Sequence, residues 1–190
     1  MSATVDNGPG SGIRRVVAVE GVSDRSALST LAGRTGRDLD AEGVIVVAMG
    51  GATNIGHFLD QYGPRGLGVP VAGLCDEREQ GDFRRALDRA GLGTDLQQHG
   101  FFVCVADLED ELIRALGVAA VEDVIEAQGE GRRYRTFLKQ PAQQGRGSTQ
   151  QLRRFVGTHS GSKDRYARAF TEAVDMSRVP QPLDRLLSWI

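Results

Sequence analysis

Acidic residues follow three of the apolar runs in the first part of the chain, at a spacing suited to metal-dependent chemistry. Glu20, Asp76 and Asp107 each come at or just after the end of such a run, and Asp24 and Glu109 follow a few residues later. Carboxylates gathered at one place repel one another unless cations are present. Oxygen ligands of this kind suit Mg²⁺ or Mn²⁺. Two such ions can activate a water and neutralise the leaving oxygen when a phosphodiester is cleaved.

A simpler interpretation treats each acid separately, as a residue near a helix N-terminus where the helix dipole favours negative charge. That interpretation explains Asp24, Glu77 and Glu109 well. It explains Glu20 less well, because Glu20 comes at the end of an apolar run and directly before a glycine.

The elements that must position these acids form an alternating pattern. Four short apolar runs alternate with amphipathic helical segments, and the runs are 16–19, 44–48, 69–75 and 101–105. Strands that are apolar throughout are typical of a parallel sheet covered on both faces. We therefore predict an α/β, doubly wound domain over residues 13–117, with about four mainly parallel strands. Ligands of such sheets bind beyond the carboxyl ends of the strands, where these acids fall.

The remainder of the chain is predicted to be helical. Residues 118–190 form a C-terminal helical region packed on the α/β domain, with helices expected at 119–128, 132–139, 149–157, 162–175 and 180–190. Residues 1–12 are rich in Gly, Ser and Pro, so we expect a disordered tail. Ser23 is the expected N-cap of the helix after the first strand.

The charge of the chain is divided by position. The formal net charge of the 190 residues is only −2, but residues 1–129 hold 11 basic and 20 acidic residues, whereas residues 130–170 hold 10 and 2. An acidic part followed by a basic part suits a site that gathers cations and grips phosphates, although two oppositely charged solvated faces would give the same pattern. The arginines expected to contact a nucleic-acid backbone are Arg132, Arg133, Arg135, Arg153 and Arg154.

No apolar run approaches the roughly 18 residues that a membrane span requires. The first residues are small and polar, without the apolar core of an export signal. Cys75 and Cys104 each lie in an apolar run and are expected to be buried, reduced thiols. These observations predict a cytoplasmic protein without a membrane partner.

Several segments resemble one known family. Residues 17–25 (VAVEGVSDR) are similar to the opening motif of the Toprim fold, in the form used by the overcoming-lysogenization-defect (OLD) nucleases. Residues 73–76 (GLCD) resemble the strand that ends in the family's Asp-x-Asp motif, and residues 107–112 (DLEDEL) resemble its later acidic motif. Residues 161–167 and 179–187 resemble its helical tail. The resemblance runs from about residue 14 to the C-terminus.

The resemblance implies roles for individual residues. The implied metal ligands are Glu20, Asp24, Asp76, Asp107 and Glu109, with Glu111 as a weaker candidate. Glu20 and Lys163 would be catalytic, with Lys163 stabilising charge on the pentacoordinate phosphate. That role suits a lone ammonium, and Lys163 is one of only two lysines beside 21 arginines. The implied cofactor is Mg²⁺ or Mn²⁺.

Two departures from the family pattern bear on activity. Arg78 replaces the second acid of Asp-x-Asp, so the site is expected to bind a second metal weakly or to use Glu77 or Glu79 instead. Members of the family usually carry an N-terminal ATPase, for which this chain has no room, so an ATPase partner would be a separate polypeptide. Members also tend to act as dimers, which implies a homodimer here.

Three functions compete at this stage. The first is a metal-dependent phosphodiester nuclease that nicks or cleaves DNA, or a related nucleotidyl transferase or hydrolase. The second is a partly inactive Toprim binding module that partners a separate ATPase in a DNA-processing complex. The third, a phospho-acceptor receiver domain, is disfavoured because Lys163 falls in the helical region and not on the sheet.

Overall fold

A computed structural model describes residues 12–158 and 161–190. Within these residues one sheet of four parallel strands forms in the order β2-β1-β3-β4. The strands are β1 (Arg15–Val19), β2 (Val44–Ala48), β3 (Val71–Asp76) and β4 (Phe101–Cys104). The predicted α/β fold with a parallel sheet is confirmed. Of the tail expected to be disordered, residues 1–12, residues 1–11 lie outside the described residues.

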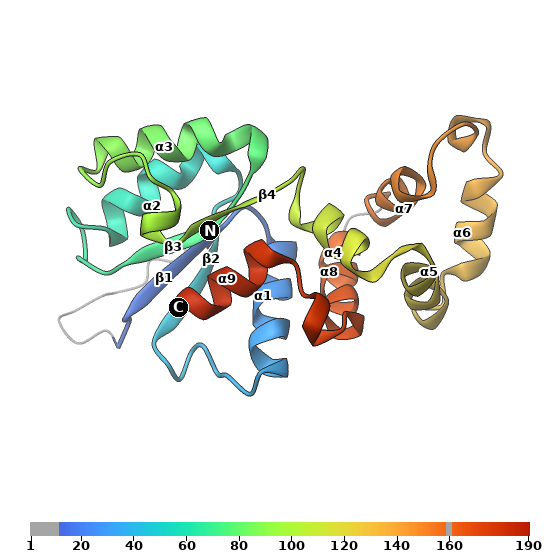
Figure 1. Cartoon of the computed structure of the whole chain (residues 1–190), viewed down its shortest axis with the longest axis horizontal. Coiled ribbons are helices and arrows are strands. Elements are labelled where there is room, and N and C mark those ends of the chain that lie inside the picture. The colour runs from blue at the N-terminus through green and yellow to red at the C-terminus, as the bar shows by residue number, and fades with distance from the viewer. Residues whose placement is uncertain (1–11, 159–160) are drawn as a thin grey trace.

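The sheet is covered on both faces, as its unbroken apolar strands require. Alternate residues of β1 face opposite sides: Val17 and Val19 belong to one hydrophobic core, Val16 and Ala18 to another, and all four are fully buried. Helices α1 (Val22–Arg34) and α9 (Gln181–Trp189) cover the first face. Helices α2 (Ile55–Tyr62) and α3 (Gln80–Arg89) cover the second (Figure 1).

Helix α8 (Ser162–Ala173) packs along α1, and α4 (Leu108–Leu116) packs against α8. Helices α5 (Val118–Ala127), α6 (Gly131–Leu138) and α7 (Ser148–Val156) extend the molecule away from the sheet (Figure 1). Aromatic rings fill their interior, with Phe155 in edge contact with Tyr134 and Phe137 at centroid distances of 5.0 and 5.5 Å. The C-terminal helices expected from the sequence are confirmed.

Helix α8 lies along α1 and is bound to it at both ends. Arg34, at the end of α1, donates hydrogen bonds to the carbonyl oxygens of Thr171 and Val174 at 2.7 and 2.6 Å. Near the start of both helices, the hydroxyl of Ser26 donates to the carboxylate of Asp164. These contacts fix the first turn of α8 beside the carboxyl edge of β1.

Helix α1 begins two residues earlier than the sequence suggests. The expected N-cap Ser23 lies inside the helix, which starts at Val22 with Gly21 as its N-cap. The carboxylate of Asp24 accepts a hydrogen bond from the Gly21 N–H at 2.9 Å. Asp24, three residues after the N-cap, thus satisfies the N–H of the N-cap residue itself.

Both cysteines are buried and free of disulfides, and burial raises the pKa of the Cys75 thiol to about 12. Among residues 12–158 and 161–190, no helix is both long and apolar enough to cross a membrane.

Candidate metal centre

The predicted acids meet in one cleft at the carboxyl edge of the sheet. The cleft has a volume of about 460 Å³ and lies where the strand order changes direction, between β1 and β3. Clefts at such switch points are the usual ligand sites of open parallel sheets. The charged residues that line it are Glu20, Asp24, Asp76, Asp107, Glu109 and Lys163.

Glu20, Asp76 and Glu79 form the tightest group of ligand atoms. Each offers one carboxylate oxygen, and these oxygens all lie within 4.8 Å of one another. Glu20 directly follows β1, Asp76 ends β3, and Glu79 is carried back toward them by a single 3-10 turn at Glu77–Glu79. Arg78 and Glu77 are exposed. Glu77 and Glu79 were the two acids expected to substitute for the second acid of Asp-x-Asp, and the structure brings only Glu79 close to Glu20 and Asp76.

Burial and repulsion between like charges together raise the pKa values of these carboxyls. Desolvation, followed by repulsion from Glu20 and Glu79, raises the pKa of Asp76 to about 7. Burial raises the pKa of Asp24 to about 6, against the opposing hydrogen bond from the Gly21 N–H. The pKa of Glu79 is raised by desolvation and by its contact with Glu20.

The cluster fits a divalent cation because its acids lack enough partners of their own. Oε2 of Glu79 is buried and has no hydrogen-bond partner among the described residues. A buried carboxylate oxygen without a donor is costly, and a cation placed among several such oxygens would relieve both the desolvation and the repulsion.

A glycine turn borders the opposite side of the cleft. Gly50 and Gly51 have φ angles of 72° and 129°, which a residue with a side chain rarely adopts. The Gly50 N–H donates to the carbonyl oxygen of Glu20 at 3.0 Å and so fixes the backbone from which that carboxylate projects.

Asp107 and Glu109 enter the cleft from the start of α4. Asp107 is the N-cap of this helix and accepts a hydrogen bond from the Asp110 N–H at 2.7 Å. Its carboxylate also forms an ion pair with Arg153, which lies 3.5 Å from Asp110 as well. The pKa of Glu109 is raised by desolvation, although the neighbouring ammonium of Lys163 opposes the shift.

Glu111, the weaker candidate, is occupied elsewhere. Its carboxylate accepts a hydrogen bond from the Val105 N–H at 2.8 Å and pairs with Arg114 at 2.9 Å. It does not line the cleft.

Lys163 reaches the cleft from the first turn of α8. Its Nζ lies 3.5 Å from a carboxylate oxygen of Glu109, and its side chain is 59% exposed. An ammonium that is held near the acids yet open to solvent can attract a phosphate to the cleft.

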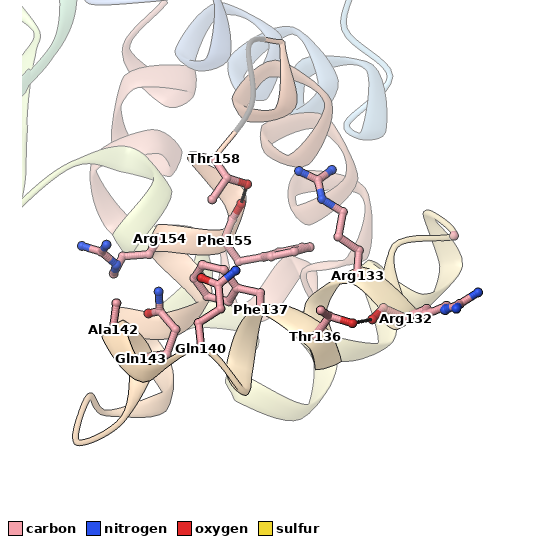
Figure 2. A pocket seen from close by; sticks show the side chains of 11 residues that line it. Arg132, Arg133, Thr136, Phe137, Gln140, Ala142, Gln143, Arg154, Phe155 and Thr158 are labelled. Atoms are coloured by element: carbon pink, nitrogen blue, oxygen red, sulfur yellow. Dashed lines mark hydrogen bonds between the residues drawn. The ribbon is translucent and has the colours of Figure 1, made fainter.

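The five arginines expected to contact nucleic acid do not form one surface. Arg132, Arg133 and Arg154 line a second pocket, between α6 and α7 (Figure 2). Arg153 is turned toward Asp107, and Arg135 forms an ion pair with Glu126. The partnership of Arg153 with Asp107 has no local sequence signal, because 46 residues separate the two.

Residues 13–77 match the family model of the Toprim domain of overcoming-lysogenization-defect-like proteins. A solved C-terminal region of the Xanthomonas campestris pv. campestris OLD protein covers 93% of this chain and 93% of its own, with 24% identity and a TM-score of 0.68. The corresponding region of the Burkholderia pseudomallei OLD protein covers 93% of this chain and 96% of its own, with 23% identity and a TM-score of 0.69. Among curated proteins no significant match is found.

These comparisons confirm the resemblance seen in the sequence. Residues 13–77 match the OLD-like Toprim domain, and the chain as a whole has the fold seen in the C-terminal regions of OLD proteins.

Proposed function

We propose that this chain is a metal-dependent phosphodiester nuclease of the Toprim type that nicks or cleaves DNA. The observation that carries the proposal is the convergence of carboxylate oxygens of Glu20, Asp76 and Glu79 within 4.8 Å, where Glu20 and Asp76 line the cleft that Lys163 also lines. The OLD-like Toprim match supports it, because this domain is generally associated with nucleases.

The residues that would hold Mg²⁺ or Mn²⁺ are Glu20, Asp24, Asp76 and Glu79, with Asp107 and Glu109 on the other side of the cleft. A bound divalent ion supplies charge neutralisation at the phosphate and activation of a water. Glu79 takes the place of the acid that Arg78 removes from the Asp-x-Asp pattern.

The charged side chains around this cluster have separate tasks. Lys163 places a positive charge where negative charge develops on the phosphate, and Glu109 holds its Nζ at 3.5 Å. Arg153 positions Asp107 through their ion pair. Arg132, Arg133 and Arg154 contact the nucleic acid beyond the cleft.

The test is nicking of supercoiled plasmid by the purified chain with Mn²⁺. We expect Glu20→Ala to reduce the nicking rate by about a hundredfold or more. Even replacement of a residue that only hydrogen-bonds to a metal ligand lowers metal affinity or activity by about 10- to 100-fold. Glu77→Ala is the matched control, since Glu77 is an exposed acid next to Asp76. Its rate should equal that of the unaltered chain. Equal rates for both variants would overturn the proposal.

A second candidate, a Toprim binding module that serves a separate ATPase, is favoured by one observation. Arg153 and Lys163 form ion pairs with Asp107 and Glu109, two of the acids expected to bind a metal. Calorimetry would separate the two candidates: the nuclease should bind Mn²⁺, whereas absence of Mn²⁺ binding together with co-purification of an ATPase would favour the binding module.

A further inference from the structure

A second pocket lies among the C-terminal helices, away from the acidic cleft. Its volume is about 620 Å³, and it is bounded by α6, the turn at Pro141–Gln143 and α7 (Figure 2). This volume is within the range of sites that bind small molecules, about 300–1,000 Å³.

The lining combines positive charge with a flat aromatic surface. Arg132, Arg133 and Arg154 contribute charge, and none of the described residues that line the pocket is acidic. Arg133 and Arg154 project from opposite sides, with the ring of Phe155 between them (Figure 2). The guanidinium of Arg133 lies over that ring at 5.7 Å from its centroid. Phe137 completes the apolar floor.

The pocket wall also contains a buried amide that lacks a partner. Gln143 is 2% exposed, and its Oε1 has no hydrogen-bond partner within the described part of the chain. The backbone carbonyl of the same residue accepts a bond from Gln151 at 2.9 Å, which ties the turn to α7. A buried acceptor left unpaired is costly. Because that oxygen is closed to solvent, the part that Gln143 takes is to hold the turn that forms one wall of the pocket.

We propose that this pocket binds a nucleotide. The base stacks on the planar guanidinium of Arg133 above Phe155, as bases do on arginine planes in other complexes. Arg154 takes the phosphate, since it makes no ion pair with any described residue. A simple anion would leave the aromatic floor unused.

One helix connects this pocket to the acidic cleft. Arg153 pairs with Asp107 in the cleft, and the next residue, Arg154, lines the pocket. A DNA strand held at the cleft would pass α7 and could place one unpaired nucleotide in the pocket. This placement rests on the proposed function. Binding of a nucleotide by itself does not, because it needs neither metal nor cleavage.

The first experiment is calorimetry on the full chain in buffer with EDTA, with dAMP as the probe. We expect dAMP to bind, and deoxyribose 5-phosphate and deoxyadenosine to bind at least about tenfold more weakly, since stacking and a charged phosphate contact are each worth about tenfold or more. Equal affinity of deoxyribose 5-phosphate and dAMP would overturn the proposal. If a trinucleotide of deoxyadenosine binds more tightly than dAMP, the natural ligand of the pocket is a nucleotide within a strand. If it binds equally or more weakly, the natural ligand is a free nucleotide.

The second experiment tests the location. Arg154→Ala should weaken dAMP binding about tenfold. Arg168→Ala, a change of an exposed arginine that does not line the pocket, should leave binding unchanged. Matching thermal midpoints of the two variants would show that both are folded. Equal losses in both variants, or no dAMP binding by the unaltered chain, would refute the pocket. Absence of plasmid nicking by the unaltered chain, together with dAMP binding, would overturn only the proposed nuclease.

Discussion

Replacing Asp76 by asparagine should stabilise the metal-free protein at pH 8 and have little effect near pH 4. The carboxyl of Asp76 is desolvated and faces the charges of Glu20 and Glu79, which together raise its pKa from 3.8 to about 7. Asparagine is neutral at every pH and has nearly the same shape. The substitution therefore removes the cost of the buried negative charge.

The sign of the effect follows from proton binding. The folded-state pKa of Asp76 is above its unfolded value, so between about pH 4 and pH 7 the folded chain binds more protons than the unfolded chain. The free energy of unfolding of the unaltered protein must then fall as the pH rises through this window. The lowered pKa values of Glu42, Glu130 and Asp175 act below this window, where those groups lose their stabilising charge on acidification.

The size of the effect can be worked from the shift. Each pKa unit is worth about 1.4 kcal/mol, so the shift of Asp76 corresponds to an upper bound of about 4 kcal/mol. Because this carboxyl is only partly buried, solvent screening reduces the expected gain at pH 8 to about 2 kcal/mol. For a chain of this length that gain raises the thermal midpoint by about 4–8 °C.

The assay is thermal unfolding in EDTA at intervals from pH 4.5 to 8. The difference between Asp76→Asn and the unaltered chain should grow with pH, and taking the difference cancels the titration of other groups. Glu77→Gln, which removes the same charge from an exposed neighbour, should change stability by less than about 0.5 kcal/mol. Adding Mn²⁺ at pH 8 should raise the midpoint of the unaltered chain more than that of Asp76→Asn. A difference that does not grow with pH, or an equal gain in Glu77→Gln, would refute the reasoning.

Three further predictions concern the cleft and the fold that positions it. Lys163→Met should lower the plasmid-nicking rate with Mn²⁺ about 100-fold, because the positive charge beside the phosphate is lost. Mn²⁺ should not bind more weakly, because Glu109 loses a competing cation; a rate equal to that of the unaltered chain would contradict the role of the ammonium. Arg34→Ala should lower the free energy of unfolding in urea by about 1–3 kcal/mol, because two hydrogen bonds to the end of α8 are lost; no change in the urea midpoint would contradict this. Gly73→Ala should cost about 3 kcal/mol in the same assay, because a Cβ there would lie 2.0 Å from the Ala18 carbonyl oxygen; a stable variant would show that β1 and β3 can separate easily.

The parallel sheet could be predicted because its physical signature is local. Strands buried on both faces must be apolar at every position, and the run at 44–48 shows this directly in the sequence. The acids at the strand ends then share an edge whatever the strand order is. For this reason Glu20, Asp76 and Asp107 could be placed in one cleft, while their roles as ligands remain proposals.

The details that depend on long-range packing could not be predicted. Arg153 lies within a basic stretch, but it turns to Asp107 because α7 packs against the start of α4. The choice of Glu79 over Glu77 depends on one 3-10 turn. The predicted division of the chain at residue 117 stays a prediction, and one hydrophobic core contains residues from both sides of it.

The most direct test of the central claim is a crystal of this chain soaked in Mn²⁺ and measured at a wavelength where manganese scatters anomalously. The proposed metal centre predicts a peak of anomalous density in contact with carboxylate oxygens of Glu20, Asp76 and Glu79. Density at other sites alone, with these three side chains unchanged and in contact with no ion, would contradict it.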